Sequence, residues 1–368
     1  MGGQELVAGP LLAVLVLLAL LGWAAFARRR HDPERGRTLA LALLLTVLAT
    51  AGNVNAYFGY LPHVADVAGL VTGGGDWPTV SAADLSATGA AHGVAATEAT
   101  DLGARYPGGG VARLPVPDGG SGTGASDALV WLPPQYFSRT TARFPVVYLL
   151  HGSPGVPADW LRGGEASAIA GGLAEHGLPA VVVMPKLSRH WLDDPECVDG
   201  ARERVETHFW ADVVPAVDAS LRTVPTRQAR TLAGMSAGGY CALNLGLKHR
   251  DRVATIVDLS GLTAPTHRGG VDRLYGPGGE QRAALDSPGD YAARLDADPP
   301  TRVWLDVGRS DHDVRPGLES LAAVLADRGL EVQLHERPGR HTFRVWRPAL
   351  SEALTWAVRG MDVDQEPA

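Results

Sequence analysis

Lysine is almost absent from this chain of 368 residues, and cysteine is scarce. Only Lys186 and Lys248 are lysines among the 33 basic residues, and the 40 acidic residues give a net charge of −7. This balance argues against nucleic acid as a partner. The two cysteines, Cys197 and Cys241, are too few for a disulfide-dense scaffold or for a four-thiolate zinc site.

The common sequence patterns of metal sites are also missing. There is no HExxH pair, and the spacing of the aspartates does not match a calcium loop. We therefore expect neither a metal nor a cofactor. The composition, with 45% hydrophobic and 20% charged residues, is that of a globular protein.

Two long uncharged runs lie near the N-terminus. Residues 6–27 and 38–61 contain 22 and 24 residues without a charge, and each run is long enough for a helix to cross a hydrocarbon core of about 30 Å. We expect both to be transmembrane helices. The alternative for the first run is a cleaved signal peptide, which needs positive charge before the apolar run, whereas here the positive cluster follows it.

The stretch between the two runs orients them. Residues 28–37 include five arginines, and the positive-inside rule places this loop in the cytoplasm. The hairpin 1–61 then holds the rest of the chain outside the cytoplasm at the cell membrane. Residues 62–110, rich in Ala, Gly and Thr, are expected to be a partly ordered tether. A single domain at 111–360 and a tail at 361–368 follow.

The domain alternates strand and helix patterns. Apolar runs predict strands at 128–132, 145–150, 180–184, 230–235, 253–259, 302–307 and 330–335, and helical patterns occur at 160–174, 206–222, 237–249, 317–328 and 343–358. This order predicts an α/β fold with a mostly parallel, doubly wound sheet, whose functional site lies at the carboxyl ends of the strands. Residues 111–116 are expected to pair with 128–132 as an antiparallel hairpin.

A GxSxG motif at Gly234–Gly238 lies between a predicted strand and a predicted helix. This context is typical of a nucleophile elbow, in which small flanking residues allow a strained turn to expose Ser236. The Ala237 N–H would then lie at a helix N-terminus and donate to an oxyanion. After another apolar strand, His151-Gly-Ser-Pro-Gly155 would supply a second donor, the Ser153 N–H.

The remaining catalytic groups are expected near the C-terminus. Ser, Asp, His is the chain order of an α/β-hydrolase triad, and Asp311 and His341 follow two successive predicted strands. His341 would accept the proton of the serine hydroxyl, and Asp311 would fix the tautomer of its imidazole. Asp313 is the alternative acid, and His312 and His335 are weaker candidates for the base.

Residues 111–357 resemble the esterase D-like branch of the α/β hydrolases, which includes the enterochelin esterases and the secreted mycolyltransferases. The motifs that carry the resemblance are Trp131-Leu-Pro-Pro134, Tyr148-Leu-Leu-His-Gly152, Gly234-Met-Ser-Ala-Gly-Gly-Tyr240, Gly308-Arg-Ser-Asp311, and Gly339-Arg-His341 followed by Trp346. The resemblance implies an α/β-hydrolase fold, a triad of Ser236, Asp311 and His341, and an oxyanion hole at Ser153 and Ala237. The added hairpin resembles membrane-tethered actinobacterial members.

The loop after the strand at 180–184 is rich in acidic residues: Asp193, Asp194, Glu196 and Asp199. Asp193 and Asp194 are candidates for binding a cationic group of the substrate, with a solvated acidic loop as the alternative. We predict that Cys197 pairs with Cys241, which would tie this loop to the helix behind Ser236. The alternative is a buried Cys241 that packs as a small apolar residue.

Three tryptophans, Trp160, Trp191 and Trp346, lie just beyond predicted strands or motifs. They are candidates for lining an acyl or glycerol pocket, with core packing as the alternative. Taken together, the chain is expected to be a membrane-anchored, extracytoplasmic serine esterase acting on lipid-linked esters of the cell envelope. The alternatives are an acyltransferase of envelope lipids or sugars and a catalytically silent envelope-binding protein.

The expected topology can be tested with impermeant thiol reagents on whole cells. A cysteine introduced at Arg35 should be protected because the loop is cytoplasmic, whereas one introduced at Ser126 should react. The Arg35→Cys protein should become reactive after permeabilisation, which serves as the control. Labelling of both positions in intact cells, or of neither, would contradict the hairpin.

Overall fold

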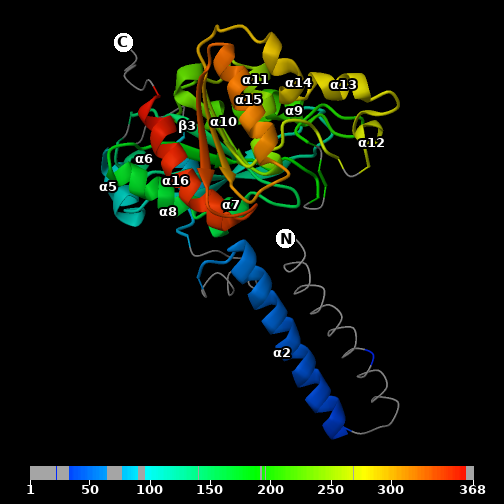
Figure 1. Ribbon diagram of the computed structural model, residues 1–368. Helices are drawn as coiled ribbons and strands as arrows, with labels where there is room; N and C mark the ends of the chain where they lie inside the picture. Colours follow the sequence, from blue (N-terminus) through cyan, green and yellow to red (C-terminus); the bar gives the residue numbers. More distant parts are fainter. Residues whose placement is uncertain are drawn as a thin grey trace. The chain divides into compact units, whose positions relative to one another are not determined.

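The computed structural model describes two units of the chain, Met1–Leu61 and Pro62–Ala368. The described residues are 22, 33–63, 77–89, 96–139, 141–190, 193–194, 196–267 and 269–361. Figure 1 shows the helix of the first unit and the layered domain of the second.

The N-terminal unit contains the helix α2 (Pro33–Phe58), which exposes a row of large apolar side chains that includes Leu41, Leu45 and Leu48. Its part from Ala40 to Phe58 is long and apolar enough to cross a membrane, judged by length and composition. Among the described residues this is one candidate span, where the sequence predicts two. The first predicted span, 6–27, lies outside the described residues except for Gly22.

The bounds of α2 differ from the predicted 38–61. The helix begins earlier, within the arginine-rich stretch, where proline is tolerated at the first position. It ends at Phe58 because Gly59 adopts a left-handed φ of 65°. The Asn55 side chain then holds Leu61, donating to its carbonyl at 2.8 Å and accepting from its N–H at 2.7 Å.

The second unit is built on one eight-stranded sheet with the order β1-β2-β4-β3-β5-β6-β7-β8. β1 and β2 are antiparallel to each other and β2 is antiparallel to β4, whereas all later neighbours are parallel. The strands are β1 (Gly110–Val116), β2 (Ser126–Leu132), β3 (Val146–Leu150), β4 (Val181–Met184), β5 (Arg230–Met235), β6 (Thr255–Leu259), β7 (Arg302–Gly308) and β8 (Glu331–Arg337). The predicted mostly parallel α/β sheet is confirmed.

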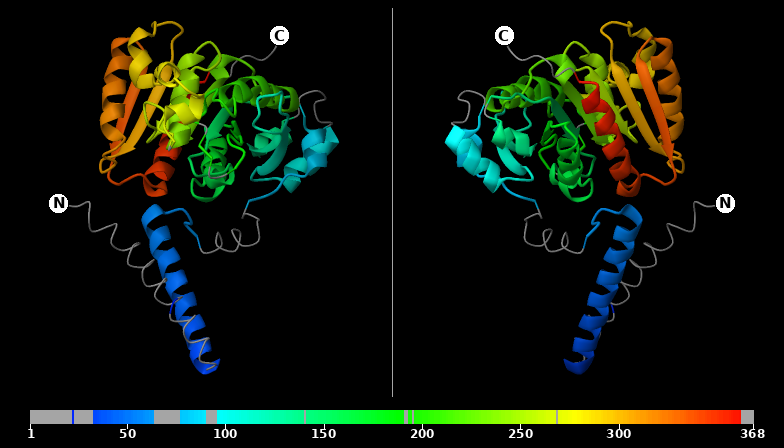
Figure 2. Two further views of the ribbon diagram at one scale, coloured as in Figure 1. Left: turned by 90° about the vertical axis from the view of Figure 1, so that its right-hand side faces the viewer. Right: turned by 90° about the vertical axis from the view of Figure 1, so that its left-hand side faces the viewer.

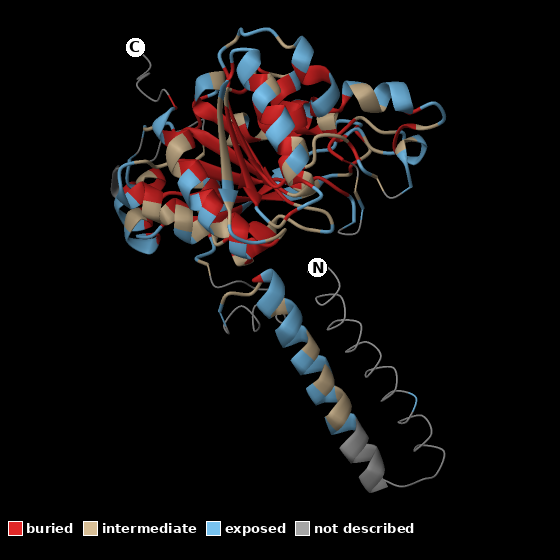
Figure 3. Ribbon diagram, in the orientation of Figure 1, coloured by how far each residue is buried: buried red, intermediate tan, exposed pale blue. Residues whose placement is uncertain are grey.

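Helices cover both faces of this sheet. In Figure 1, α7 (Ala158–Arg162), α8 (Ala166–Glu175) and α16 (Phe343–Arg359) lie on one side, and α10 (Val214–Ser220), α11 (Ala237–Lys248) and α15 (Arg315–Asp327) lie on the other. α11 packs on β3, β5 and β6, and α16 packs on β6, β7 and α8. The strands β3 to β6 are therefore buried throughout (Figure 3), as their continuous apolar sequences predict.

Two predicted helices are divided, and one group of helices was not predicted. The pattern at 160–174 forms α7 and α8, and the pattern at 206–222 forms α9 (Val205–His208), a π-helical turn (Phe209–Val213) and α10. Between β6 and β7 lie α12 (Val271–Tyr275), α13 (Glu280–Leu285), α14 (Pro288–Tyr291) and a 3₁₀ turn (Ala292–Arg294). Further short helices are α6 (Pro134–Ser138) and a 3₁₀ turn (Arg227–Ala229).

Much of the segment expected to be a tether belongs to the domain. The described part of 62–110 contains α4 (Ala82–Ala87) and α5 (Ala96–Arg105), and residues 78–80 run beside β1, where the Val80 N–H donates to the Val111 carbonyl at 2.8 Å. Leu85, Leu102 and Tyr106 are buried in the main core. The sequence does not predict these helices, because a few apolar side chains, rather than a periodic apolar pattern, provide their packing. Figure 2 shows this segment against one end of the sheet.

The two cysteines form a disulfide. Cys197 lies on the loop after β4 and Cys241 on α11, and their Cα atoms are 5.3 Å apart. Both residues are buried, with 2% and 3% of their surface exposed. The bridge therefore attaches the acidic loop to the helix that begins at the GxSxG serine.

Removal of this bridge should destabilise the domain. The cysteines are 44 residues apart in the sequence, and closing a loop of this length removes about 4 kcal/mol of chain entropy from the unfolded state. We expect a Cys197→Ser/Cys241→Ser variant to lose stability of this order in urea unfolding. Reduction of the wild-type protein before unfolding provides the matched control. Two free thiols in the non-reduced wild-type protein would contradict the bridge.

Candidate active site

The GxSxG serine occupies a strained turn between β5 and α11. Ser236 has a positive φ of 56°, a backbone conformation that residues other than glycine seldom adopt. The turn closes tightly because its flanking glycines lack side chains. A Cβ on Gly234 would lie 1.8 Å from the Gly238 carbonyl oxygen, and a Cβ on Gly238 would lie 2.0 Å from the Leu150 carbonyl oxygen. The two glycines of the motif are therefore required by close backbone packing.

The turn leaves Ser236 accessible and places a backbone donor beside it. Ser236 and Ala237 are both half-buried. Ala237 is the first residue of α11, so its N–H has no acceptor within the helix. This group is free to donate to an anion that forms next to the serine oxygen.

A continuous hydrogen-bonded chain links Ser236, His341 and Asp311. The Nδ1 of His341 lies 2.7 Å from Asp311 Oδ2, and its Nε2 lies 2.7 Å from Ser236 Oγ. Because a carboxylate only accepts hydrogen bonds, Nδ1–H donates to Asp311, and Nε2 is left to accept the Ser236 hydroxyl proton. The structure thus brings together the three residues that the sequence nominates.

Two loops hold the acid and the base in register. The Asp311 N–H donates to the Gly308 carbonyl at 2.9 Å, and the Ser310 N–H donates to the Gly339 carbonyl at 2.9 Å. The first bond closes a turn within the loop after β7, and the second joins this loop to the loop after β8, which carries His341. Asp311 is buried, whereas Asp313 is exposed. The geometry therefore favours Asp311 over the alternative acid.

The other candidate bases lie elsewhere. His312 is exposed, and the ring of His335, on β8, stacks on Trp304 with centroids 3.8 Å apart. Neither makes a hydrogen bond to Ser236 among the described residues.

Two of the three candidate tryptophans are buried, as in the core-packing alternative. Trp160 is fully buried in α7, so it packs in the core and cannot line a pocket. Trp346 is 7% exposed, and its ring meets His341 edge-on with centroids 4.8 Å apart. Its ring therefore packs against the catalytic imidazole. Trp191 lies outside the described residues.

The loop after β3 lies against the serine. A Cβ on Gly152 would be 3.4 Å from Ser236 Cβ, so the backbone leading to Ser153 passes directly beside the nucleophile. The buried His151 fixes this loop, because its Nδ1–H donates to the Gly152 carbonyl at 2.9 Å and its Nε2 accepts from the Leu187 N–H at 3.3 Å. Burial lowers the pKa of His151, which favours the neutral ring. The sequence motif contains His151, but the hydrogen bonds by which it fixes the loop could not be predicted from the sequence.

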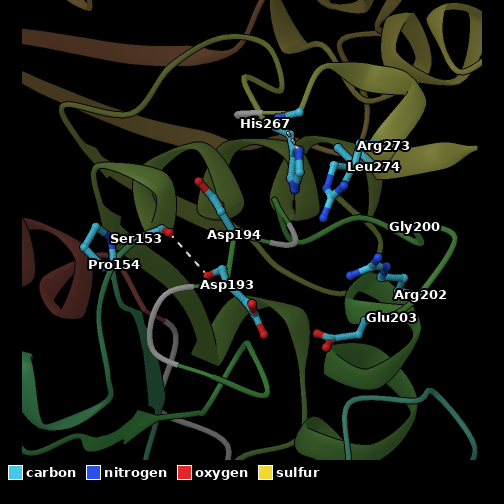
Figure 4. A pocket seen from close by; sticks show the side chains of 11 residues that line it. Ser153, Pro154, Asp193, Asp194, Gly200, Arg202, Glu203, His267, Arg273 and Leu274 are labelled. Carbon is cyan, nitrogen blue, oxygen red and sulfur yellow. Dashed lines mark hydrogen bonds between the residues drawn. The ribbon is translucent and has the colours of Figure 1, made fainter.

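A cavity of about 480 Å³ opens beside Ser153 (Figure 4). Asp193 and Asp194 line it, and the Ser153 hydroxyl donates to the Asp193 carbonyl at 3.3 Å. The other lining side chains are Pro154, Arg202, Glu203, His267, Arg273 and Leu274. The sequence identifies the two aspartates but not the arginines, Glu203 or His267. The rule that sites lie at the carboxyl ends of strands could have directed attention to His267, which follows β6.

Glu196 lies buried behind this cavity, with 3% of its surface exposed. Its Oε1 accepts from the Thr266 N–H at 2.8 Å and thereby joins the acidic loop to the loop after β6. Burial, assisted by the nearby Asp194 carboxylate, raises the pKa of Glu196 to about 7. Among the described residues, no group of three His, Cys, Asp or Glu side chains could hold a metal ion.

The strand order and the serine turn define the fold as that of the α/β hydrolases. The family model described as "Putative esterase" matches residues 125–357, and the chain belongs to this esterase family. A solved ferulic acid esterase has the same fold, with a TM-score of 0.61 and 21% identity over 69% of this chain and 99% of that one.

Relatives occur in two actinobacteria. An uncharacterized protein of Corynebacterium glutamicum is 28% identical over 66% of this chain and 59% of its own length. An esterase of Mycobacterium tuberculosis is 28% identical over 58% of this chain and 52% of its own length. The chain therefore spans little more than half the length of these relatives.

The raised pKa of Glu196 has a consequence for stability. Between its ordinary value of 4.5 and about 7, the folded protein keeps a proton that the unfolded chain has lost. The free energy of unfolding should therefore fall as the pH rises through this range, by up to about 3 kcal/mol. Glu196→Gln, which keeps an acceptor for Thr266, should reduce this dependence in urea unfolding at pH 5 to 8. Burial also raises the pKa of Asp306, to about 6, so a smaller slope should remain.

The exposed Asp313→Asn variant is the control and should retain the wild-type pH slope. If Glu196→Gln also retained that slope, Glu196 would not be the titrating group.

Proposed function

We propose that the domain is a serine esterase that forms an acyl-enzyme on Ser236. The observation that supports this most strongly is the continuous chain of hydrogen bonds from Ser236 through His341 to the buried Asp311. Ser236 itself is half-buried and lies at the carboxyl end of β5. Membership of the esterase family supports the same reaction class.

The reaction would begin with attack of the Ser236 oxygen on the ester carbonyl carbon. His341 Nε2 takes the hydroxyl proton, and Asp311 stabilises the resulting imidazolium. The negative oxygen of the tetrahedral intermediate accepts hydrogen bonds from the N–H groups of Ala237 and Ser153. When the C–O bond breaks, His341 returns the proton to the leaving alcohol. Water, activated by the same imidazole, then hydrolyses the acyl-enzyme and restores Ser236.

We further propose that the substrate is a lipid-linked ester of the cell envelope and that the domain acts outside the cytoplasm. The exposed leucines of α2 support an anchor, which would raise the effective concentration of the domain near membrane esters. In the described part of the domain, Leu285 is the one exposed large hydrophobic side chain. A surface of this kind does not insert into lipid, so the scissile ester would lie in the polar head-group layer.

Loss of the triad residues should abolish turnover. Ser236→Ala and His341→Ala should each reduce hydrolysis of p-nitrophenyl acetate by several orders of magnitude, because triad members act as a unit. Asp311→Asn should have a much larger effect than Asp313→Asn, since only Asp311 contacts His341. Wild-type protein, but not Ser236→Ala, should be labelled by a fluorophosphonate.

Thermal unfolding would verify that each variant is folded. Undiminished hydrolysis by Ser236→Ala would refute the proposed nucleophile. Product analysis with added alcohols distinguishes hydrolysis from acyl transfer, and lipid profiling of membranes with and without Ser236 tests the substrate.

A further inference from the structure

We propose that the cavity beside Ser153 selects esters whose alcohol part is zwitterionic, carrying an ammonium group together with a phosphate or carboxylate. This inference rests on the proposed esterase activity of Ser236. It follows from the distribution of charge around the cavity, which has Asp193 and Asp194 next to Ser153 and two arginines, with Glu203 beside one of them, farther from it.

The acidic end of the cavity adjoins Ser153, whose neighbour Gly152 lies against Ser236. Asp193 is held next to Ser153 by the hydrogen bond from the serine hydroxyl to its carbonyl, and Asp194 follows it in the chain. Figure 4 shows both aspartates on the same side of the pocket as Ser153. A cationic group that enters here would lie close to the ester that Ser236 attacks.

The basic end comes from two other loops. Arg273 projects from α12 and Arg202 from the loop before α9, and the Ala201 N–H donates to the Leu274 carbonyl at 2.8 Å, which joins these two segments. In Figure 4 both arginines lie across the pocket from Ser153. Neither arginine forms an ion pair within the described part of the chain.

His267 adds a directed donor. Its Nδ1 accepts from the Gly269 N–H at 3.0 Å, so in the neutral ring the proton lies on Nε2. Figure 4 shows the ring turned into the pocket. Two guanidinium groups and one imidazole N–H are a donor set suited to a phosphate or carboxylate.

Glu203 lines the cavity beside Arg202 without neutralising it. Its Oε2 is buried and has no hydrogen-bond partner among the described residues. Burial and the Asp193 carboxylate raise the pKa of Glu203. Within the described part of the chain, the cavity therefore holds two arginines without an ion pair and one carboxylate oxygen without a hydrogen bond.

This arrangement excludes simpler ligands. A lone anion would face the carboxylates of Asp193, Asp194 and Glu203, and a lone cation would face two guanidinium groups. A ligand with both charges satisfies both ends, and a cavity of about 480 Å³ has the size of an ordinary small-molecule site. The loops are fixed in place by the disulfide at Cys197 and by the contact between Glu196 and Thr266.

The test uses four acetate esters that differ in the charge of the alcohol: isopropyl acetate, acetylcholine, 3-acetoxybutyrate and acetylcarnitine. These alcohols are neutral, cationic, anionic and zwitterionic. We expect the wild-type kcat/KM for acetylcarnitine to exceed that for each of the other three by about tenfold or more, as for one added charge-assisted contact. Acetylated glycerophosphocholine, in which the phosphate lies nearer the ester than the ammonium does, reverses this order of charges and should be hydrolysed more slowly than acetylcarnitine.

Two double variants separate the two ends of the cavity. Arg202→Gln/Arg273→Gln should abolish the preference for acetylcarnitine over acetylcholine, and Asp193→Asn/Asp194→Asn should abolish its preference over 3-acetoxybutyrate. Both changes should appear mainly in KM. Arg294→Gln, at an exposed arginine on the 3₁₀ turn before β7, is the matched control and should keep the wild-type preferences.

The outcomes distinguish this inference from the proposed function. Hydrolysis of all four acetates at similar kcat/KM, or equal losses on all four in the double variants, would overturn the zwitterion site while leaving the esterase intact. Absence of Ser236-dependent hydrolysis and of fluorophosphonate labelling would overturn both.

Discussion

The close approach of three backbone segments at the end of β5 is the constraint on which the rest of the site depends. Gly234 must meet Gly238 without a side chain, and Gly238 must meet the carbonyl of Leu150. This packing forces Ser236 into a positive φ, and α11 begins at the next residue. It also brings the loop after β3 alongside the nucleophile, so that one turn positions the serine and both expected oxyanion donors.

The acid and the base of the triad lie on loops that follow other strands of the sheet. β6 lies between β5 and β7, and the loops after β7 and β8 are joined to each other by backbone hydrogen bonds before they present Asp311 and His341. Trp346 supports the imidazole from α16. On the other side, the disulfide fastens the acidic loop to α11. The nucleophile helix therefore connects the reacting groups with the charged cavity.

The sequence reveals the parts of the site that depend on local patterns. The strands and the Ser236 turn follow from apolar runs and glycine spacing, and the chain order identifies Asp311 and His341. The cavity residues Arg202 and Arg273 carry no such signal, because they are brought together by α12 and by the disulfide-bound loop. Trp160 could not be placed from its position after a strand alone. The helices of the segment before β1 were hidden because their buried side chains are few and irregularly spaced.

The buried position of Glu196 would also couple binding at the proposed cation site to proton exchange. With a pKa of about 7, its carboxyl group is about half ionised at neutral pH. A cationic group that binds beside Asp194 would offset the negative charge that helps to hold the proton on Glu196. Binding would then release a fraction of a proton to the solvent, and the heat of binding would depend on the ionisation enthalpy of the buffer. A carboxyl group that never touches the ligand would in this way contribute to the energetics of its capture.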